Sequence, residues 1–308
     1  MEIALQFVLL ALGFVMLAKG ADWFVEGAAG IAMRFGIPQL VIGLTIVAMG
    51  TSAPEAAVSI AAAVKGNADI TIGNIVGSNI LNILVILGLA ASIVPIAVAR
   101  STLRIEIPFM IGVTALLFYQ GRDGSISLAD GGVLMVAFAV YMMYLYTMAM
   151  KSNVDSDLEE TGLPLGRCLL GAVGGLALII AGSNVTVGAA TSIATYAGLS
   201  ERFIGLTIVA LGTSLPELFT SVAAARRGNA DIAIGNIVGS NIFNILFVVG
   251  LSALIIDIPF ASAFNFDTYV ALGAAVLLWL CVLRTQRLQR WAGALMLVCY
   301  AAYLLYIL

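Results

Sequence analysis

Residues 42–84 read IGLTIVAMGTSAPEAAVSIAAAVKGNADITIGNIVGSNILNIL, and residues 204–246 read IGLTIVALGTSLPELFTSVAAARRGNADIAIGNIVGSNIFNIL. The two segments agree at 33 of 43 positions without a gap, at a constant offset of 162 residues. The identities include Glu, Asp, Pro, Asn, Thr and Ser at matching places, so a biased composition does not explain them. The chain therefore contains an internal repeat whose best-matched part is rich in polar residues.

The rest of the chain is strongly apolar. Of its 308 residues, 62% are hydrophobic and 10% are charged, with a mean hydropathy of +1.10. Soluble domains average about 45–50% apolar and about 25% charged residues. A soluble globule has no interior large enough for this apolar excess, which excludes a soluble enzyme, a nucleic-acid-binding protein and a disordered chain. The composition predicts a multi-pass protein of the cell membrane.

Apolar runs of about 20 residues or more, interrupted by Gly, Pro or charge, predict an all-α polytopic membrane protein with ten transmembrane helices. The predicted spans are 3–33, 37–64, 69–94, 100–120, 126–150, 164–195, 200–225, 231–255, 265–284 and 290–308. They divide into two five-helix repeats, 1–150 and 164–308, joined by the hydrophilic linker 151–163, with the best-matched segments at about 37–94 and 200–255.

Basic residues predict the orientation of these spans. Ten Lys or Arg residues fall on one side and three on the other. Because cytoplasmic loops carry the excess of Lys and Arg, we expect the linker 151–163 in the cytoplasm and both termini outside. Five spans per repeat mean that the second repeat enters the membrane from the opposite side, so the repeats are inverted. Inverted repeats are typical of alternating-access transporters, and a symmetric scaffold without transport is the alternative.

Each repeat places one glutamate near the middle of the membrane. Glu55 follows GTSAP and Glu217 follows GTSLP, far from both ends of their predicted spans. A carboxylate at this depth costs about 2.5–3.5 kcal/mol on insertion scales. Neither motif contains a Lys or Arg at a comparable depth, which predicts a partner cation from outside the chain. The alternative is a kinked helix whose glutamate is buried against backbone donors.

A proline precedes each glutamate. Pro54 and Pro216 lack a backbone N–H, and each ring clashes with the carbonyl four residues earlier, at Gly50 and Gly212. Backbone carbonyls released in this way are tolerated in a membrane only where they line a cavity or are otherwise satisfied. The candidate carbonyl donors are Ala48, Thr51, Ala210 and Thr213.

A second polar stripe follows each motif at spacing i, i+4, i+8, which places its members on one helix face. Its members are Asn74, Ser78 and Asn82 in the first repeat and Asn236, Ser240 and Asn244 in the second. We expect the serine and the last asparagine of each stripe to bind a cation. For the first asparagine of each stripe, ligation and hydrogen bonding between helices are equal alternatives.

These candidate ligands are all oxygen atoms, which suit hard cations. Ca²⁺ takes 6–8 oxygens in flexible geometry, whereas Mg²⁺ gives up its water reluctantly. Soft metals prefer Cys or His, and the chain has no His. One Ca²⁺ neutralises two ionised glutamates, or two or three Na⁺ occupy the same oxygens. Competition for one set of carboxylates predicts antiport.

With GTSAPE…GNIVGSNILN and GTSLPE…GNIVGSNIFN, the chain resembles the Ca²⁺/cation antiporter superfamily, and most of all its prokaryotic sodium/calcium exchangers. The resemblance implies four cation sites, one for Ca²⁺ and up to three for Na⁺, and sliding of the first and sixth spans across the other eight. The implied ligands are Glu55 and Glu217 as central carboxylates, oxygens of Thr51, Ser52, Thr213 and Ser214, the carbonyls of Ala48 and Ala210, and Ser78, Asn82, Ser240 and Asn244.

One departure from some relatives bears on the transported ions. Potassium-dependent exchangers carry Asp where this chain has Asn244, which argues against K⁺ co-transport. The linker 151–163 is also too short for the regulatory domain of animal exchangers.

We therefore expect an electrogenic exchange of three Na⁺ for one Ca²⁺, with no cofactor, nucleic acid or obligatory protein partner. The alternative on the same fold is H⁺/Ca²⁺ antiport, because two close carboxylates can share a proton. A passive channel would need a continuous pore. An intramembrane enzyme would need a nucleophile with a base, or paired aspartates, and the sequence shows neither.

Overall fold

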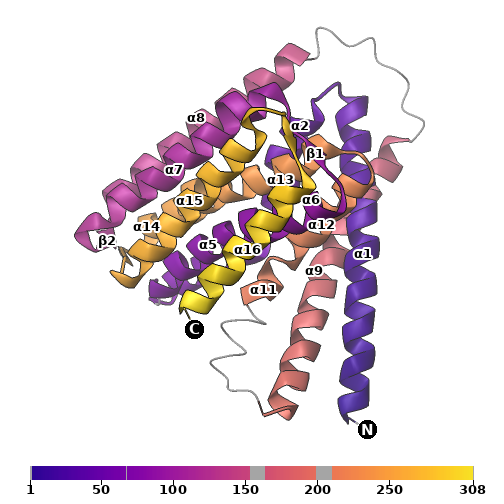
Figure 1. Ribbon diagram of the computed structural model, residues 1–308, viewed down its shortest axis with the longest axis horizontal. Helices are drawn as coiled ribbons and strands as arrows, with labels where there is room; N and C mark the ends of the chain where they lie inside the picture. Colours follow the sequence, from indigo (N-terminus) through magenta and orange to yellow (C-terminus); the bar gives the residue numbers. More distant parts are fainter. Residues whose placement is uncertain (1, 67, 153–163, 199–209, 308) are drawn as a thin grey trace.

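The structure is a computed structural model that describes residues 2–66, 68–152, 164–198 and 210–307. It is a bundle of helices (Figure 1). The first repeat contains α1 (Glu2–Arg34), α2 (Gln39–Ile42), η1 (Gly43–Val47), α3 (Ala48–Thr51), α4 (Ala53–Val64), α5 (Asp69–Leu81), η2 (Asn82–Leu87), α6 (Gly88–Ile93), η3 (Thr102–Glu106), α7 (Ile107–Gln120), η4 (Gly121–Asp123) and α8 (Leu128–Ser152). The second contains α9 (Leu165–Tyr196), α11 (Ala210–Thr213), α12 (Leu215–Arg226), α13 (Ala230–Phe243), η6 (Asn244–Val249), α14 (Gly250–Ile255), α15 (Ala263–Leu283) and α16 (Arg290–Ile307).

The prediction of an all-helical membrane protein is confirmed. Within the described ranges, eight helices are long and apolar enough to span a membrane. The helices Gln39–Thr51 and Ala53–Val64, bent by 52° at a short break, make a ninth candidate when the pair is counted as one span. Part of the predicted span 200–225 and nearly all of the linker 151–163 lie outside the described residues.

Wide helical turns interrupt several spans. The segments η1, η2, η3 and η6 are π-helical, a conformation that is rare and is frequently found at functional sites. Two of them begin at equivalent asparagines of the two repeats, η2 at Asn82 and η6 at Asn244. The polar stripes of the sequence therefore end where the helical turns widen.

Two short strand pairs, which the sequence did not predict, connect the repeats. Strand β1 (Ile96–Ala97) pairs antiparallel with β4 (Arg287–Leu288), and β2 (Ser125–Ile126) pairs with β3 (Ile258–Pro259). The offset of 162 residues relates β1 to β3 and β2 to β4. Each pair therefore joins a connecting segment of one repeat to a connecting segment of the other, as two repeats of the same structure would.

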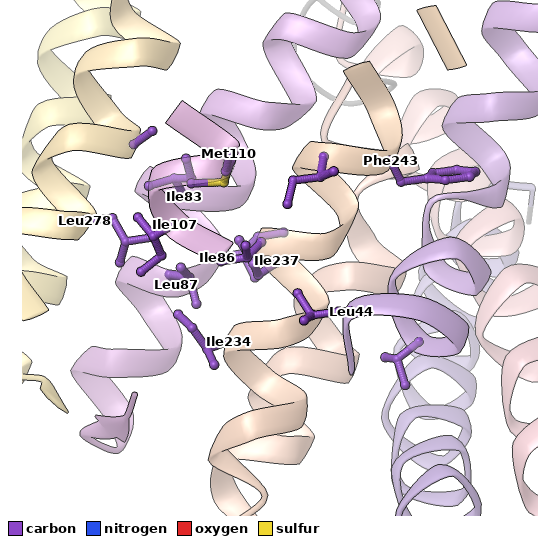
Figure 2. Close-up of a cluster of buried hydrophobic side chains, with 14 of the residues drawn as sticks. Leu44, Ile83, Ile86, Leu87, Ile107, Met110, Ile234, Ile237, Phe243 and Leu278 are labelled. Atoms are coloured by element: carbon purple, nitrogen blue, oxygen red, sulfur yellow. The ribbon is translucent and has the colours of Figure 1, made fainter. Parts of the chain in front are cut away.

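The centre of the bundle is built from the third and eighth spans. Ile86 and Leu87 of η2 lie close to Ile237 and Ile234 of α13 (Figure 2), and all four side chains are buried. Burial of these aliphatic side chains leaves few ways to move the two spans relative to each other, because protein interiors are close-packed. The polar stripes on these spans therefore sit on a rigid support.

Helices α1 and α9 run alongside each other at one edge of the bundle (Figure 1). Their backbones meet at glycines: a methyl group added at Gly27 would lie 2.4 Å from the Ala172 backbone nitrogen, and one added at Gly175 would lie 2.4 Å from that of Phe24. Small residues allow such close approach between membrane helices. The two long helices therefore form one closely packed pair.

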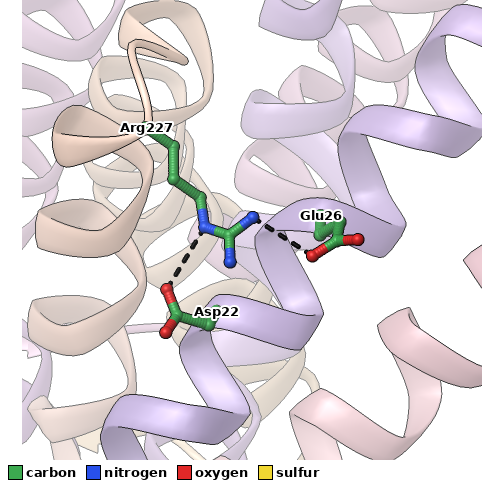
Figure 3. Close-up of polar contacts among 3 residues, drawn as sticks. All are labelled: Asp22, Glu26 and Arg227. Atoms are coloured by element: carbon green, nitrogen blue, oxygen red, sulfur yellow. Dashed lines mark hydrogen bonds and ion pairs between the residues drawn. The ribbon is translucent and has the colours of Figure 1, made fainter.

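An arginine at the end of α12 ties α1 to the rest of the bundle. Arg227 Nε lies 3.2 Å from Asp22 Oδ1, and its Nη1 lies 3.2 Å from Glu26 Oε2 (Figure 3). The pairs are partly exposed to solvent, so each contributes at most about 1 kcal/mol. At the equivalent places on α9, the residues are the uncharged Asn184 and Gly188. The ion pairs therefore have no counterpart in the other repeat.

We predict that Gly27→Ala destabilises the protein by about 1–3 kcal/mol, because an added methyl overpacks a backbone contact. Thermal unfolding of the purified protein in detergent, followed with size-exclusion chromatography, measures the effect. The matched control is Gly174→Ala on α9, where an added methyl would meet no other atom within 4 Å. Equal unfolding temperatures for the two variants would contradict close packing of α1 and α9.

Candidate ion-binding site

Two broken helices carry the two intramembrane glutamates. The chain bends at Ser52 between α3 and α4, and the second repeat breaks in the same way at Ser214 between α11 and α12. Glu55 and Glu217 lie in the first turn of the half-helix that follows each break. The N-terminal end of a helix favours negative charge. Both glutamates are 1% exposed.

The two repeats hold each other's carboxylates. Ser52 Oγ donates a hydrogen bond to Glu217 Oε1 at 2.8 Å, and Ser214 Oγ donates one to Glu55 Oε1 at 3.2 Å. Each carboxylate is therefore bound by the hydroxyl next to the break in the opposite repeat. The second oxygen of each glutamate, Oε2, is buried without a hydrogen-bond partner among the described residues.

The threonine beside each serine belongs to the same arrangement. Thr51 lies near the Glu217 carboxylate, and Thr213 lies near that of Glu55. Thr51 Oγ1 also donates to Asn236 Oδ1 at 3.0 Å. The structure thus groups both predicted Thr–Ser pairs around the two glutamates.

No described lysine or arginine neutralises this pair of acids. The ion pairs among the described residues join Arg227 to Asp22 and Glu26, which lie outside the group formed by the glutamates and their hydroxyl donors. The two carboxylates are close enough to interact electrostatically with each other. Like charges in a low dielectric repel strongly, so the pair needs protons or a cation.

The carbonyl released by the second proline has a partner. Ser183 Oγ on α9 donates to the Gly212 carbonyl at 2.7 Å, as expected for a carbonyl that has lost its helical partner to Pro216. The residue equivalent to Ser183 in α1 is Ala21, which has no hydroxyl. Helix α9 therefore contacts the site through a hydrogen bond that α1 does not reproduce.

The Ala48 carbonyl oxygen, which the sequence predicts to be a cation ligand, already accepts hydrogen bonds in this structure. Ser52 N donates to it at 3.0 Å, and the hydroxyls of Thr51 and Ser240 reach it at 3.3 Å each. Its counterpart Ala210 begins α11. A cation at Ala48 would therefore replace hydroxyl contacts that the structure shows.

The first asparagine of each polar stripe forms hydrogen bonds between helices. Asn74 Nδ2 donates to Ser59 Oγ at 2.8 Å, and Asn236 Nδ2 donates to Ser221 Oγ at 2.9 Å. Both amides also reach the backbone carbonyl of the glutamate in their own repeat, at 3.2 and 3.4 Å. Of the two alternatives left open by the sequence, the geometry favours the structural one.

The remaining members of the stripes are buried beside unsatisfied oxygens. Ser78 is 5% exposed and Ser240 is fully buried. Asn82 and Asn244 are also buried, and the Oδ1 atom of each lacks a hydrogen-bond partner in the described part of the chain. An unpaired buried polar atom costs about 1–3 kcal/mol. Two amide oxygens and two carboxylate oxygens are thus available to a cation.

Sequence reasoning missed two asparagines that contact this site. Asn79 and Asn241 are buried, and each donates its amide to the backbone carbonyl of the other at 3.1 Å. They also accept hydrogen bonds from the amides of Asn244 and Asn82, at 3.1 and 3.0 Å. The signal was their identity across the repeat, but they lie off the i, i+4 face from which ligands were chosen.

Comparison with known proteins identifies the family. A model of the sodium/calcium exchanger protein family matches residues 5–147 and 168–308. The chain belongs to this family. It is a multi-pass membrane exchanger of calcium and other cations, a transporter and not an enzyme.

Several relatives match nearly the whole chain. The sodium/calcium exchanger MaX1 of Methanosarcina acetivorans is 32% identical, with 98% of both chains covered. The inner membrane protein YrbG of Escherichia coli strain K12 is 39% identical over 94% of this chain and 92% of that protein. The solved structure of the sodium-calcium exchanger NCX_Mj, soaked with Na⁺ and Sr²⁺, matches with a TM-score of 0.86 and 34% identity over 98% of both chains.

We predict that Ser183→Ala lowers the stability of this exchanger by about 1–3 kcal/mol, because the Gly212 carbonyl then lacks its side-chain donor. Thermal unfolding in detergent is the measurement. Ser192→Ala on the same helix is the control, since that exposed hydroxyl donates, among the described residues, to the Gly188 carbonyl one turn earlier. A control variant as unstable as Ser183→Ala would argue against a specific role for the Ser183 hydrogen bond.

Proposed function

We propose that this chain exchanges Na⁺ for Ca²⁺ by alternating access, with three Na⁺ for one Ca²⁺ and no requirement for K⁺. The observation that carries the proposal is the buried pair Glu55 and Glu217, each hydrogen-bonded by the serine of the opposite repeat. The ligands come from both repeats, and in the proposed cycle the first and sixth spans, α1 and α9, slide across the other helices and open this shared site to one side of the membrane at a time.

The proposed ligands are those of the sequence analysis. They are Glu55, Glu217, Thr51, Ser52, Thr213, Ser214, Ser78, Asn82, Ser240 and Asn244, with the carbonyls of Ala48 and Ala210. All are oxygen donors, as hard cations require. The free oxygens of the two glutamates and of the two final asparagines support this set.

The proposed ratio of three Na⁺ to one Ca²⁺ makes the exchange electrogenic. Two ionised glutamates carry a charge of −2, which one Ca²⁺ cancels and three Na⁺ exceed by one. Exchange of three Na⁺ for one Ca²⁺ therefore moves one charge across the membrane in each cycle. The membrane potential then contributes about 2.3 kcal/mol per 100 mV.

A neutral side chain at position 244 supports independence from K⁺. The Asn244 amide donates to Asn79 Oδ1 and leaves one free oxygen, whereas an aspartate there would add a negative charge and a second oxygen acceptor. With asparagine at position 244 the site carries one negative charge fewer than it would with aspartate, so it balances one positive charge fewer. This fits a site that binds Na⁺ and Ca²⁺ but not K⁺.

H⁺/Ca²⁺ antiport is the second candidate function, favoured by the two glutamates themselves, since close carboxylates can share a proton. Protons need no amide oxygens, however. The unpaired Oδ1 atoms of Asn82 and Asn244 therefore favour a second metal cation over a proton as the counter-ion.

The proposed topology places both termini outside and the linker 151–163 in the cytoplasm. The side rich in Lys and Arg includes Arg227, whose ion pairs with Asp22 and Glu26 hold α1. In this topology the ion pairs lie toward the cytoplasmic side of the membrane.

We predict that an outward-directed Na⁺ gradient drives ⁴⁵Ca²⁺ uptake into proteoliposomes that contain the purified protein. Because each cycle moves charge, a K⁺ diffusion potential set with valinomycin should change the initial rate. Protein-free liposomes and vesicles without a Na⁺ gradient are the controls. Uptake that ignores Na⁺ and follows a pH gradient would assign the second candidate function instead.

We predict that Glu55→Gln and Glu217→Gln each reduce Ca²⁺ exchange at least a hundredfold, because one charge that cancels Ca²⁺ is lost. The same uptake assay measures this, and size-exclusion chromatography reports folding. Glu106→Gln is the matched control. Glu106 is another buried intramembrane glutamate, but the Tyr144 hydroxyl on α8 binds it, away from the two broken helices. Exchange that survives in either of the first two variants would remove that glutamate from the site.

A further inference from the structure

We infer that Asn79 and Asn241 are positioning residues, which turn the side chains of Asn244 and Asn82 so that oxygen, and not the NH₂ group, is free to bind the transported cation. The inference rests on the proposed function. It adds to that function the hydrogen bonds that decide which end of two asparagine ligands faces the cation. It concerns two residues that are not themselves among the proposed ligands.

A carboxamide ligand needs neighbouring groups that fix its orientation. The two ends of the group have nearly the same shape, but one is a hydrogen-bond acceptor and the other is a donor of two hydrogens. Rotation by half a turn about the last bond of the side chain exchanges them. An asparagine that presents its NH₂ group repels the cation that its oxygen would bind. A buried asparagine therefore serves as a cation ligand only if its neighbours select one orientation.

The backbone selects the orientation of Asn79. Its Nδ2 lies 3.1 Å from the carbonyl of Asn241, and a backbone carbonyl only accepts hydrogen bonds. The NH₂ group of Asn79 must therefore face that carbonyl, which directs Oδ1 of the same side chain elsewhere.

The orientation then passes from Asn79 to a predicted ligand. Asn79 Oδ1 lies 3.1 Å from Asn244 Nδ2. Because this oxygen only accepts, Asn244 must present its NH₂ group there. Asn244 Oδ1 is left buried and without a hydrogen-bond partner in the described part of the protein. A backbone carbonyl thus determines, through one intermediate side chain, which end of Asn244 is free.

The same two hydrogen bonds occur with the repeats exchanged, and we call each such chain, from backbone carbonyl to first asparagine to second asparagine, a relay. Asn241 Nδ2 donates to the Asn79 carbonyl at 3.1 Å, and Asn241 Oδ1 accepts from Asn82 Nδ2 at 3.0 Å. Asn82 Oδ1 is again unpartnered. All four asparagines are at most 3% exposed, so water does not compete for these hydrogen bonds. Each repeat orients the ligand of the other, as with the serines that bind the glutamates.

The chemistry of the relay requires asparagine at positions 79 and 241. Each side chain must donate to a carbonyl and accept from an amide at the same time, which a carboxamide does. Aspartate offers no donor when ionised, and leucine of similar size offers neither group. Replacement by leucine therefore leaves the next asparagine free to rotate, without removing any proposed ligand.

The test is a double-mutant cycle with Asn79→Leu in two backgrounds, the wild-type chain and Asn244→Asp. A carboxylate presents oxygen in either rotation and needs no positioning. Equilibrium binding of ⁴⁵Ca²⁺ to the purified protein, and its displacement by Na⁺, are measured beside the unfolding temperature. We expect Asn79→Leu to weaken Ca²⁺ binding about tenfold or more in the wild-type background, or about 1.4 kcal/mol, and less than about twofold in the Asn244→Asp background.

Two controls keep the test decisive. Asn241→Leu with and without Asn82→Asp repeats the cycle in the other repeat, and it takes the place of the first cycle if Asn79→Leu does not fold. Ser252→Ala removes a buried hydroxyl from α14 that has no described hydrogen-bond partner, and it should leave Ca²⁺ binding unchanged.

Each result has one meaning. Equal weakening in both backgrounds would show that Asn79 acts through packing alone and would overturn the inference, as would unchanged binding in both. A wild-type chain that binds no Ca²⁺ would refute the proposed function and this inference with it. Loss of binding that is confined to the asparagine background supports positioning.

Discussion

The structure depends on two carboxylates that are buried together in a membrane protein, where no basic residue of the described ranges forms an ion pair with them. Glu55 and Glu217 are 1% exposed, and each receives a serine hydroxyl from the opposite repeat. One hydroxyl does not offset the cost of a buried charge. The remaining stabilisation must come from ions or protons that enter and leave. The same electrostatic cost that would destabilise a static protein thus gives an exchanger its affinity for cations.

The two repeats are related in sequence, yet they differ where the helices α1 and α9 contact the site. Ser183 of α9 binds the Gly212 carbonyl, and the equivalent residue of α1 is Ala21. Arg227 pairs with two acids of α1, and the equivalent places on α9 are uncharged. The helices α1 and α9 are therefore the places where the described contacts of the two repeats are least alike.

Much of the site was predictable, because its chemistry repeats in the sequence. The breaks at Ser52 and Ser214 follow from the prolines two residues later, and the burial of both glutamates follows from the apolar spans around them. Helical spacing placed Asn82 on the face of Asn74, but it assigned Asn74 no single role. The structure shows Asn74 bound to Ser59, a partner on another helix that helical spacing alone does not identify.

The sequence by itself determined that this chain lies in a membrane, repeats itself in inverted halves and buries two acids. Composition, the number of spans in each repeat and the effect of proline on a helix can all be evaluated along the chain, without knowledge of contacts between distant residues. Only the tertiary structure decided which groups satisfy one another. The crossed bonds of Asn79 and Asn241, the serine pairs and the ion pairs of Arg227 all join residues more than 150 positions apart. Hydrogen bonds at such separations depend on how helices pack, and packing is a property of the whole bundle.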